Sequence, residues 1–493
     1  MKMFEYCSCE RTGIKTEYIL RFLKFFEEYD IPVHSILMAR GRSVFLECNY
    51  PPFSSDKLHR MYSVSKSFVS MAVGLALTEG LFSLDDKIID FFPEYRNENT
   101  DEMYDAVTIR DMLTMRSNIA SFNPWWQIYD DRVRAYYDQK TAKASGTLFY
   151  YDSMGSYLLG CIVEKLTGKT FLSYLKEKVL SKMGFSDESY TIYAPGKYTL
   201  GDSGVLCTPR DLLIFARFIM DGGVYDGVRY IDEIFMKNAV SKQVDCNIEG
   251  VFSKYRSYGY GYLIWKMPND GFALVGMGGQ LAVCDVAHDI IFVITADCQA
   301  SDETARELIL DHLYNDIISN IEPQSLCENE KAKSVLAGFL ASQKLVCQKG
   351  NPSSAISSSV SLKKYLLQKN PLGIECFSLY FEEEKGVLVY QKNGAKNHLE
   401  FGIGKNVLCD IPCDTKNTDV AGKTEQGSYC AACSGAWVSD NEFALKIQIT
   451  DTYLGCLNVR FSFKGKCVCV CMKKSGQYIL SGYEGYFIGK EEE

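Results

Sequence analysis

A serine and a lysine three residues apart, in Ser63-Val64-Ser65-Lys66, form the pattern of this chain with the clearest chemical potential. On a helix the two side chains lie on one face, one turn apart. A lysine kept neutral by burial can take the proton of the neighbouring hydroxyl, which turns the serine oxygen into a nucleophile. The spacing therefore predicts that Ser63 attacks a carbonyl carbon and that Lys66 is its base.

The S-x-x-K spacing alone is common, so its context must choose among four occurrences. The other three are Ser54/Lys57, Ser173/Lys176 and Ser361/Lys364. After Ser63, apolar residues recur at helical spacing as far as Glu79, and Gly80 ends the run. Ser63 is thus expected at the N-terminus of a buried helix, where backbone N–H groups and the helix dipole stabilise an oxyanion. The alternative is that Ser63 only caps this helix.

The elements that must position this pair are strands at both ends of a long helical region. A helix is expected at residues 16–29, followed by a hairpin at 34–39 and 43–48. Mostly helical sequence extends to about residue 184. Strands are then expected at 260–266, 272–275, 281–285 and 290–296, and a helix at 302–318 closes the region. This order predicts an α+β fold, an antiparallel sheet flanked by helices with an inserted helical subdomain.

The C-terminal third of the chain has a different pattern. Charged and serine-rich sequence interrupts the first pattern after residue 320. From Ile374 onward, alternating apolar and polar residues recur between turn residues, which predicts a small all-β domain, a barrel or a sandwich. We therefore expect one domain at 1–325, a linker region at 326–370 and an all-β domain at 371–493.

The charge of the chain argues against two classes of partner. Its 493 residues include 53 basic and 62 acidic side chains, a net charge of −9, which disfavours nucleic acid or an anionic membrane surface. The N-terminal sequence lacks the apolar segment of a secretory signal, and the longest apolar run, residues 68–77, is about half the length of a membrane span. We therefore expect a cytoplasmic protein without a membrane span that acts on a small-molecule or peptide substrate.

Four of the nineteen cysteines form a weak candidate for a metal site. Cys409, Cys413, Cys430 and Cys433 offer four thiols at a loosely zinc-like spacing. The plainer interpretation is that they are small apolar residues of strands, reduced as is typical of a chain without a secretory signal. The favoured expectation is that no metal and no cofactor is bound.

A second serine pattern imitates a different kind of nucleophile. Gly201-Asp202-Ser203-Gly204 is similar to the serine segment of chymotrypsin-like proteases, which depend on a histidine base. None of the five histidines has a triad-like setting in the sequence. A histidine-based mechanism is therefore not expected.

Five sequence blocks occur in an order that resembles the serine β-lactamase-like hydrolases. The similarity is to the branch with class C β-lactamases, D-aminopeptidases and esterases, which are penicillin-binding-protein-like, and it covers roughly residues 15–320. The all-β domain loosely resembles the lipocalin-like barrels appended to some members. The blocks are SVSKSFVSMAVGLALTEGLFSLDDKI, VTIRDMLTMRSNI, FYYDSMGSYLLGCIVEKLTG, GDSGVLCTPRDLLIFARFIMDGG, and YGYGYLIW with GMGGQLAVCD.

The resemblance implies roles for the first two motifs. In that family the serine and lysine of S-x-x-K are nucleophile and base, which carries onto Ser63 and Lys66. The family's Tyr-x-Asn element resembles Tyr151-Asp152-Ser153. Tyr151 would relay a proton to the leaving group, and Ser153 replaces the usual asparagine, so its contact with substrate or Lys66 would reach less far. The alternative register places Tyr150 in the same role.

The family's third motif is altered in this chain. Its Lys-Thr-Gly or His-x-Gly aligns with Met277-Gly278-Gly279, and methionine brings neither a charge nor a hydrogen-bond donor. Gly279 would still let a substrate backbone approach the strand. The N–H of Gln280 is expected to join that of Ser63 as the oxyanion hole, and the Gln280 side chain is a candidate for the missing polar contact.

Together these residues imply an acyl-transferring serine hydrolase that acts on an ester or amide with a small acyl or D-amino group. A true β-lactamase or D,D-peptidase is an alternative, but both normally require export and favour a cationic or histidine third motif. The other alternative is a catalytically silent binding or regulatory protein that keeps the fold. Met277 and Ser153 favour it, whereas the intact set of Ser63, Lys66 and Tyr151 argues against it.

Overall fold

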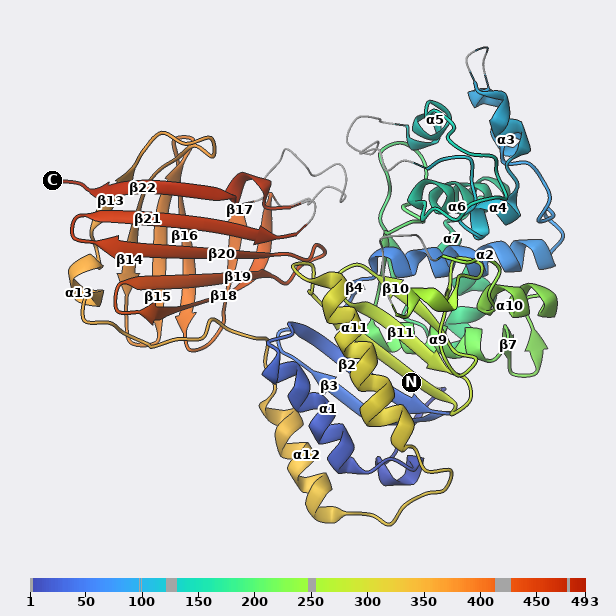
Figure 1. Ribbon diagram of the computed structural model, residues 1–493, viewed down its shortest axis with the longest axis horizontal. Helices are drawn as coiled ribbons and strands as arrows, with labels where there is room; N and C mark the ends of the chain where they lie inside the picture. Colours follow the sequence, from blue (N-terminus) through green and yellow to red (C-terminus); the bar gives the residue numbers. More distant parts are fainter. Residues whose placement is uncertain are drawn as a thin grey trace. The chain divides into compact units, whose positions relative to one another are not determined.

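The chain divides into two compact units, Met1–Gln343 and Lys344–Glu493. The computed structural model describes residues 3–493 except 97, 99, 121–130, 247–253, 413–426 and 477–478. Figure 1 shows the strands and helices of both units. Residues 326–370, the predicted linker region, contain helix α12 (Glu330–Ser342) of the first unit, and α13 (Ser357–Val360) and strand β13 (Lys364–Leu367) of the second.

The first unit is built on a seven-stranded sheet with the order β1-β3-β2-β12-β11-β10-β9. All neighbours are antiparallel except β1 and β3. The N-terminal hairpin joins the C-terminal strands because Ile36 of β2 pairs with Ile294 of β12. The predicted antiparallel sheet, completed by distant segments, is confirmed. Its strands are β1 (Glu5–Tyr6), β2 (Val33–Arg40), β3 (Ser43–Asn49), β9 (Trp265–Lys266), β10 (Phe272–Gly276), β11 (Gln280–Asp285) and β12 (Ile290–Ala296).

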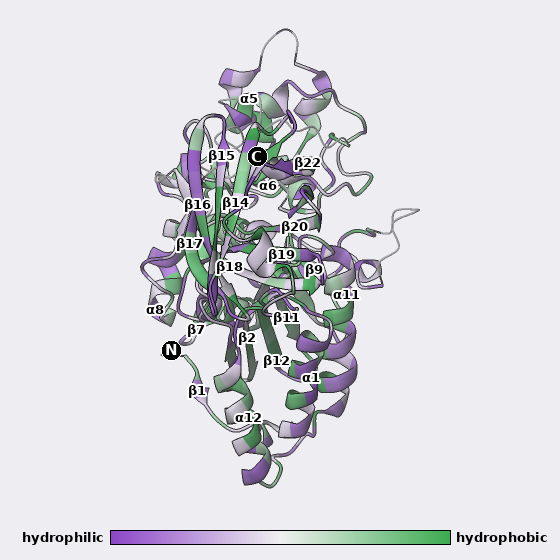
Figure 2. Cartoon of the chain, turned by 90° about the vertical axis from the view of Figure 1, so that its left-hand side faces the viewer, coloured by the Kyte–Doolittle hydropathy of each residue, from purple (hydrophilic) through white to green (hydrophobic). Residues whose placement is uncertain are grey.

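Helices cover both faces of this sheet. Helices α1 (Thr16–Glu28), α11 (Asp302–His312) and α12 share a hydrophobic core with one face, where the rings of Phe22 and Phe292 meet at 5.8 Å. Figure 2 shows apolar residues along the strands, whereas α1 carries both polar and apolar residues. Helix α9 (Pro209–Met220) contacts β2, β11 and β12 from the other face, to which Cys284 points.

A mostly helical region lies in the sequence between the strands of the main sheet, as predicted, and it also contains two small sheets that were not predicted. The helices are α2 (Ser65–Thr78), α3 (Ile88–Phe91), α4 (Ile109–Leu113), α5 (Arg132–Tyr137), α6 (Ser153–Thr167), α7 (Phe171–Leu175), α8 (Ser181–Met183) and α10 (Glu233–Val240). The small sheets contain β4 (His59–Arg60), β6 (Val205–Cys207) and β5 (Tyr190–Thr191), and β7 (Val224–Tyr225) with β8 (Val228–Arg229). In the described ranges, no helix has both the length and the apolar character needed to cross a membrane.

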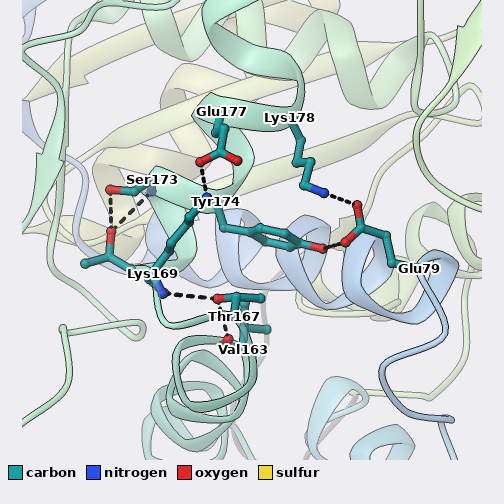
Figure 3. A network of polar contacts seen from close by, with 9 residues as sticks. Glu79, Val163, Thr167, Lys169, Ser173, Tyr174, Glu177 and Lys178 are labelled. Carbon is teal, nitrogen blue, oxygen red and sulfur yellow. Dashed lines mark hydrogen bonds and ion pairs between the residues drawn. The ribbon is translucent and has the colours of Figure 1, made fainter.

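Helix α2 is enclosed by its neighbours and fixed at its far end. It packs against α6, α7 and α10, and a Cβ on Gly74 would lie 2.5 Å from a ring carbon of Phe235. At its C-terminal end, Glu79 accepts hydrogen bonds from Tyr174 at 2.8 Å and from Lys178 at 2.5 Å (Figure 3). These contacts hold the helix along its length, and its first turn therefore has a defined position.

The second unit is a β-barrel closed by nine strands, because β16 pairs with β18 while β17 pairs with the other end of β18. Its apolar side chains point inward and leave a void of about 30 Å³, room for no more than about two water molecules. The predicted all-β domain is therefore a filled barrel. Its remaining strands are β14 (Ile374–Phe381), β15 (Lys385–Lys392), β16 (Ala395–Ile403), β17 (Val407–Pro412), β18 (Ser428–Ser439), β19 (Glu442–Ile449), β20 (Cys456–Lys464), β21 (Cys467–Ser475) and β22 (Gly485–Glu491).

Candidate active site

Ser63 lies in a single turn of 3-10 helix, Tyr62–Val64, that runs directly into α2. The backbone N–H groups of a helix's first turn have no acceptor within the helix, so the N–H of Ser63 is available to a ligand. The residue before it, Tyr62, is buried and has a φ of 46°, a left-handed conformation that is uncommon outside glycine. Backbone strain of this kind is concentrated at functional sites.

The amine of Lys66 lies against the hydroxyl of Ser63. The Nζ to Oγ distance is 3.0 Å, and Nζ also lies 2.8 Å from the backbone carbonyl oxygen of Asp202. Lys66 is 1% exposed, and both acceptors are uncharged groups. The geometry therefore brings a buried amine to the serine oxygen, as the motif requires for proton transfer between them.

The other three S-x-x-K pairs are arranged differently. Their lysine amines are bonded to groups other than the serine of the motif. Lys57 donates to the carbonyl of Pro52 at 2.9 Å, Lys176 to the carbonyls of Asp187 and Ser189 at 2.8 and 2.9 Å, and Lys364 to Glu492 at 2.8 Å. The pair that the helical context favoured in the sequence, Ser63 and Lys66, is thus the pair whose side chains are in contact.

The Gly201-Asp202-Ser203-Gly204 segment contributes to the site through its backbone. Besides the Asp202 carbonyl, the N–H of Val205 just after it donates to Ser65 Oγ at 2.9 Å. A Cβ on Gly201 would lie 3.0 Å from Cγ2 of Val69, so a glycine permits this approach to α2. The residue types did not predict this contact, because it is made by a backbone carbonyl. The flanking glycines indicate only that the backbone can approach a neighbour closely here.

The ring of Tyr151 lies beside the same amine, with its centroid 5.1 Å from Lys66 Nζ. On either side of it in the chain, the N–H of Tyr150 donates to the carbonyl of Met115 at 2.9 Å and that of Asp152 contacts the Met115 sulfur at 3.1 Å. Tyr151 also stacks on Trp265 at a centroid distance of 5.9 Å. Ser63, Lys66 and Tyr151 are therefore brought together from two segments.

Asp152 and Ser153 begin helix α6 beside this tyrosine. The Asp152 carboxyl group caps the helix by accepting the N–H groups of Met154 and Gly155, and it also accepts the hydroxyl of Ser117 at 3.0 Å. Burial raises the pKa of Asp152 above its ordinary value, although these hydrogen bonds oppose the shift. Ser153 is the first residue of α6 and is half-buried.

The segment that replaces the family's third motif is a tight turn between β10 and β11. Gly278 and Gly279 have φ values of 78° and 91°, in the left-handed region that favours glycine. Just before the turn, a Cβ on Gly276 would lie 2.3 Å from the carbonyl oxygen of Met61. Strand β10 thus lies against the backbone that leads into Ser63.

The side chain of Gln280 is turned into the protein, contrary to the expectation that it offers a polar contact to substrate. It is fully buried, and its amide nitrogen donates to the carbonyls of Met277 at 3.0 Å and Ala296 at 2.7 Å. Its amide oxygen accepts the N–H of Ala296 at 3.3 Å. The amide is used to hold the turn, and the backbone N–H of Gln280 stays a prediction for the oxyanion hole.

The candidate zinc ligands do not form a cluster in the part of the chain that is described. Cys413 lies outside the described residues. Cys433 belongs to the barrel core, whereas Cys430, three positions earlier on the same strand, contacts Thr450 at 3.5 Å on the other face. Among the described residues, no three or more His, Cys, Asp or Glu side chains are arranged to hold a metal ion.

Comparison with known proteins places this site within a matched region. The family model described as Beta-lactamase matches residues 21–314, more than half of the chain. A 6-aminohexanoate-dimer hydrolase of Paenarthrobacter ureafaciens is 25% identical over 284 residues, which cover 52% of this chain and 71% of that relative. Esterase EstB of Burkholderia gladioli is 24% identical over 171 residues, 30% of this chain and 42% of the esterase.

The fold of the first unit also has solved counterparts. A penicillin-binding protein homologue from Caulobacter crescentus superposes with a TM-score of 0.50 at 14% sequence identity, covering 63% of this chain and 99% of that one. At this identity the likeness concerns the fold alone.

Proposed function

Because the chain belongs to the beta-lactamase family, we propose that it is a serine hydrolase that forms an acyl-enzyme on Ser63. The observation that carries this proposal is the 3.0 Å contact between Lys66 Nζ and Ser63 Oγ, made by a lysine that is 1% exposed. The relatives named as a hydrolase and an esterase support the reaction class. The proposed bond cleaved is that of an ester or amide.

In the proposed mechanism, Lys66 takes the proton of Ser63 as Oγ attacks the carbonyl carbon of the substrate. The N–H groups of Ser63 and Gln280 receive the negative charge on the carbonyl oxygen. When the tetrahedral intermediate collapses, the leaving group departs with a proton relayed through Tyr151. Water then attacks the ester of Ser63, releases the acid and restores the serine hydroxyl. Each step uses groups of this chain and water.

We further propose that the substrate has a small neutral acyl or D-amino group near the scissile bond. Met277 stands where the family's cation would meet a substrate carboxylate, so a β-lactam or D-peptide would lose one attractive partner. Beside Tyr151, the half-buried Trp265 adds an aromatic side chain to the site, and the buried ring of Tyr260 packs against it at 4.7 Å. These features support a neutral ester or amide as substrate more than an anionic one.

Covalent labelling of the full chain tests the proposal. A fluorophosphonate probe should add one adduct to the wild-type protein in an intact-mass measurement and none to Ser63→Ala. Ser173→Ala is the matched control, because Ser173 belongs to another S-x-x-K pair, and it should be labelled like the wild type. If neither the fluorophosphonate nor p-nitrophenyl esters label the wild type, the catalytically silent alternative is favoured.

A further inference from the structure

The backbone of the turn Met277-Gly278-Gly279 is held by hydrogen bonds from several neighbouring segments. The buried side-chain amide of Gln280 donates to the Met277 carbonyl. The N–H of Cys298, which follows strand β12, donates to the carbonyl of Gly278 at 2.9 Å. A turn with two glycines in left-handed conformations has much conformational freedom to lose, so such contacts determine whether it keeps one shape.

A third contact comes from a carboxyl group. Asp302 is the first residue of α11, and its Oδ1 accepts the N–H of Gly278 at 2.9 Å. Arg306 lies 3.6 Å from the other oxygen of the same carboxyl group. Burial raises the pKa of Asp302 above its ordinary value, with Arg306 and the Gly278 N–H opposing the shift. The carboxyl group of Asp302 is therefore held between the Gly278 N–H and Arg306.

We propose that Asp302 is a positioning residue for the reaction at Ser63, acting by holding the Met277-Gly278-Gly279 turn and, through it, the backbone N–H of Gln280. The inference rests on the proposed function. Only Gly279 lies between Gly278, whose N–H is bonded, and the proposed oxyanion donor Gln280, and Gly276, at the start of the turn, lies against the Met61 carbonyl. A loosened turn would misplace the donor relative to Ser63.

Asp302 is a sharper test of this idea than Gln280. The Gln280 side chain is fully buried and bonds to backbone groups of two segments, so its removal threatens the fold itself. The Asp302 side chain is 29% exposed. Asn at this position keeps an oxygen that accepts the Gly278 N–H, whereas Ala removes the acceptor. The pair Asp302→Asn and Asp302→Ala therefore separates the charge of the side chain from its role as hydrogen-bond acceptor.

The matched control is Glu303→Ala. Glu303 is the next residue of the same first helical turn, so it interacts with the same helix dipole. Its carboxylate pairs with Arg256 at 2.9 Å and with Arg306 at 3.4 Å. Both Ala variants therefore remove an acidic side chain from the start of α11. Of the two, Asp302→Ala is the variant that also removes the acceptor of the Gly278 N–H.

Two readouts on the full chain test the inference. In hydrogen–deuterium exchange, the segment containing residues 276–280 should exchange at least about tenfold faster in Asp302→Ala than in the wild type or Glu303→Ala. With p-nitrophenyl acetate, Asp302→Ala should lower kcat about tenfold or more and leave KM within about twofold, because an oxyanion donor acts in the transition state. Asp302→Asn should lie closer to the wild type in both measurements.

The failure of this inference is distinguishable from failure of the proposed function. If Ser63→Ala hydrolyses the ester as fast as the wild type, the proposed function is wrong, whatever Asp302 does. If hydrolysis depends on Ser63 but Asp302→Ala keeps the wild-type kcat, or its 276–280 segment exchanges at the wild-type rate, the positioning role is overturned. Equal losses in Asp302→Asn and Asp302→Ala would also overturn it, since the geometry requires only an acceptor.

Discussion

The proposed base, Lys66, has two uncharged acceptors, a hydroxyl and a backbone carbonyl. The contacts of Lys66 therefore orient the amine toward Ser63 without tying it to a counter-ion. This is the arrangement that a base needs if it is to receive a proton and pass it on.

Tyr151→Phe tests the proposed proton relay at the residue scale. The variant keeps the ring stacked on Trp265 and removes only the hydroxyl, so we expect a stable protein whose turnover of an ester falls by a factor of about 10² to 10⁴. Single-turnover and steady-state rates provide the measurement. Tyr150→Phe is the control and should retain the wild-type rates. Loss in Tyr150→Phe instead would show that the register is shifted by one residue.

At this scale, the sequence was informative about side chains and silent about backbone contacts. Ser63 and Lys66 were separated from three other pairs by the helical periodicity that follows them. The contact of Lys66 with Asp202 was not predictable from residue types, because a carbonyl is present at every position. The direction of the Gln280 amide was predicted incorrectly, because its buried partners at Met277 and Ala296 lie on backbone brought together only by the fold.

Among the elements, local patterns and the union of distant strands in one sheet were predicted, whereas the short strands and their partners were not. The hairpin of β2 and β3 and helix α1 were expected within a few residues of their observed ends, because period-2 and period-3.6 patterns are local signals. The pairing of His59–Arg60 in β4 with β6 joins segments far apart in the chain, and strands of two or three residues carry no periodicity to detect. Strand β4 of this small sheet nonetheless lies directly before the turn that carries Ser63.

Gly276→Ala tests the packing of strand β10 against the turn that carries Ser63. Its Cβ would meet the Met61 carbonyl at 2.3 Å, and this backbone atom cannot move without moving the nucleophile. We expect a destabilisation of about 1–3 kcal/mol and a loss of Ser63 labelling, measured by urea unfolding and by intact mass.

The control for this prediction is a helical glycine that has open space around it. Gly338 lies in α12, where an added Cβ meets nothing within 4 Å. Gly338→Ala should stabilise the protein by about 0.5–1 kcal/mol and leave labelling unchanged. A Gly276→Ala variant with wild-type stability and labelling would contradict the close approach.

Over the whole molecule, the two units have separate hydrophobic cores. Unfolding is therefore expected to involve two transitions, to which a single free energy does not apply. In the first unit, a buried histidine pair links β2 to β4. His59 Nδ1 lies 3.1 Å from the carbonyl of Arg60 and so carries a hydrogen, which leaves Nε2 to accept from His34 Nδ1 at 2.8 Å.

This pair predicts how the stability of the first unit depends on pH. Burial lowers the pKa of His59 from 6.5 to about 4 in the folded protein, despite an opposing hydrogen bond to Arg60. Between these values the unfolded chain binds a proton that the folded chain does not. The first unit should therefore lose about 3 kcal/mol of stability as pH falls from about 6.5 to about 4.

Differential scanning calorimetry at several pH values provides the measurement. One transition should move to lower temperature through this window, and His59→Gln should reduce that movement. In the described part of the second unit no histidine is buried, so its transition should shift less. Equal shifts of both transitions in the wild type, or an unchanged slope in His59→Gln, would contradict the role of the pair.

The anchoring of the glycine turn has a consequence for how this protein can change. The contacts that hold the turn use its backbone: the Met277 carbonyl, and the N–H and carbonyl of Gly278. None of these three contacts uses the Met277 side chain. We therefore expect the three contacts to persist when position 277 carries another side chain, even a cationic one. A preference for neutral over anionic substrates would then be an adjustable trait, set by a single side chain on a fixed frame.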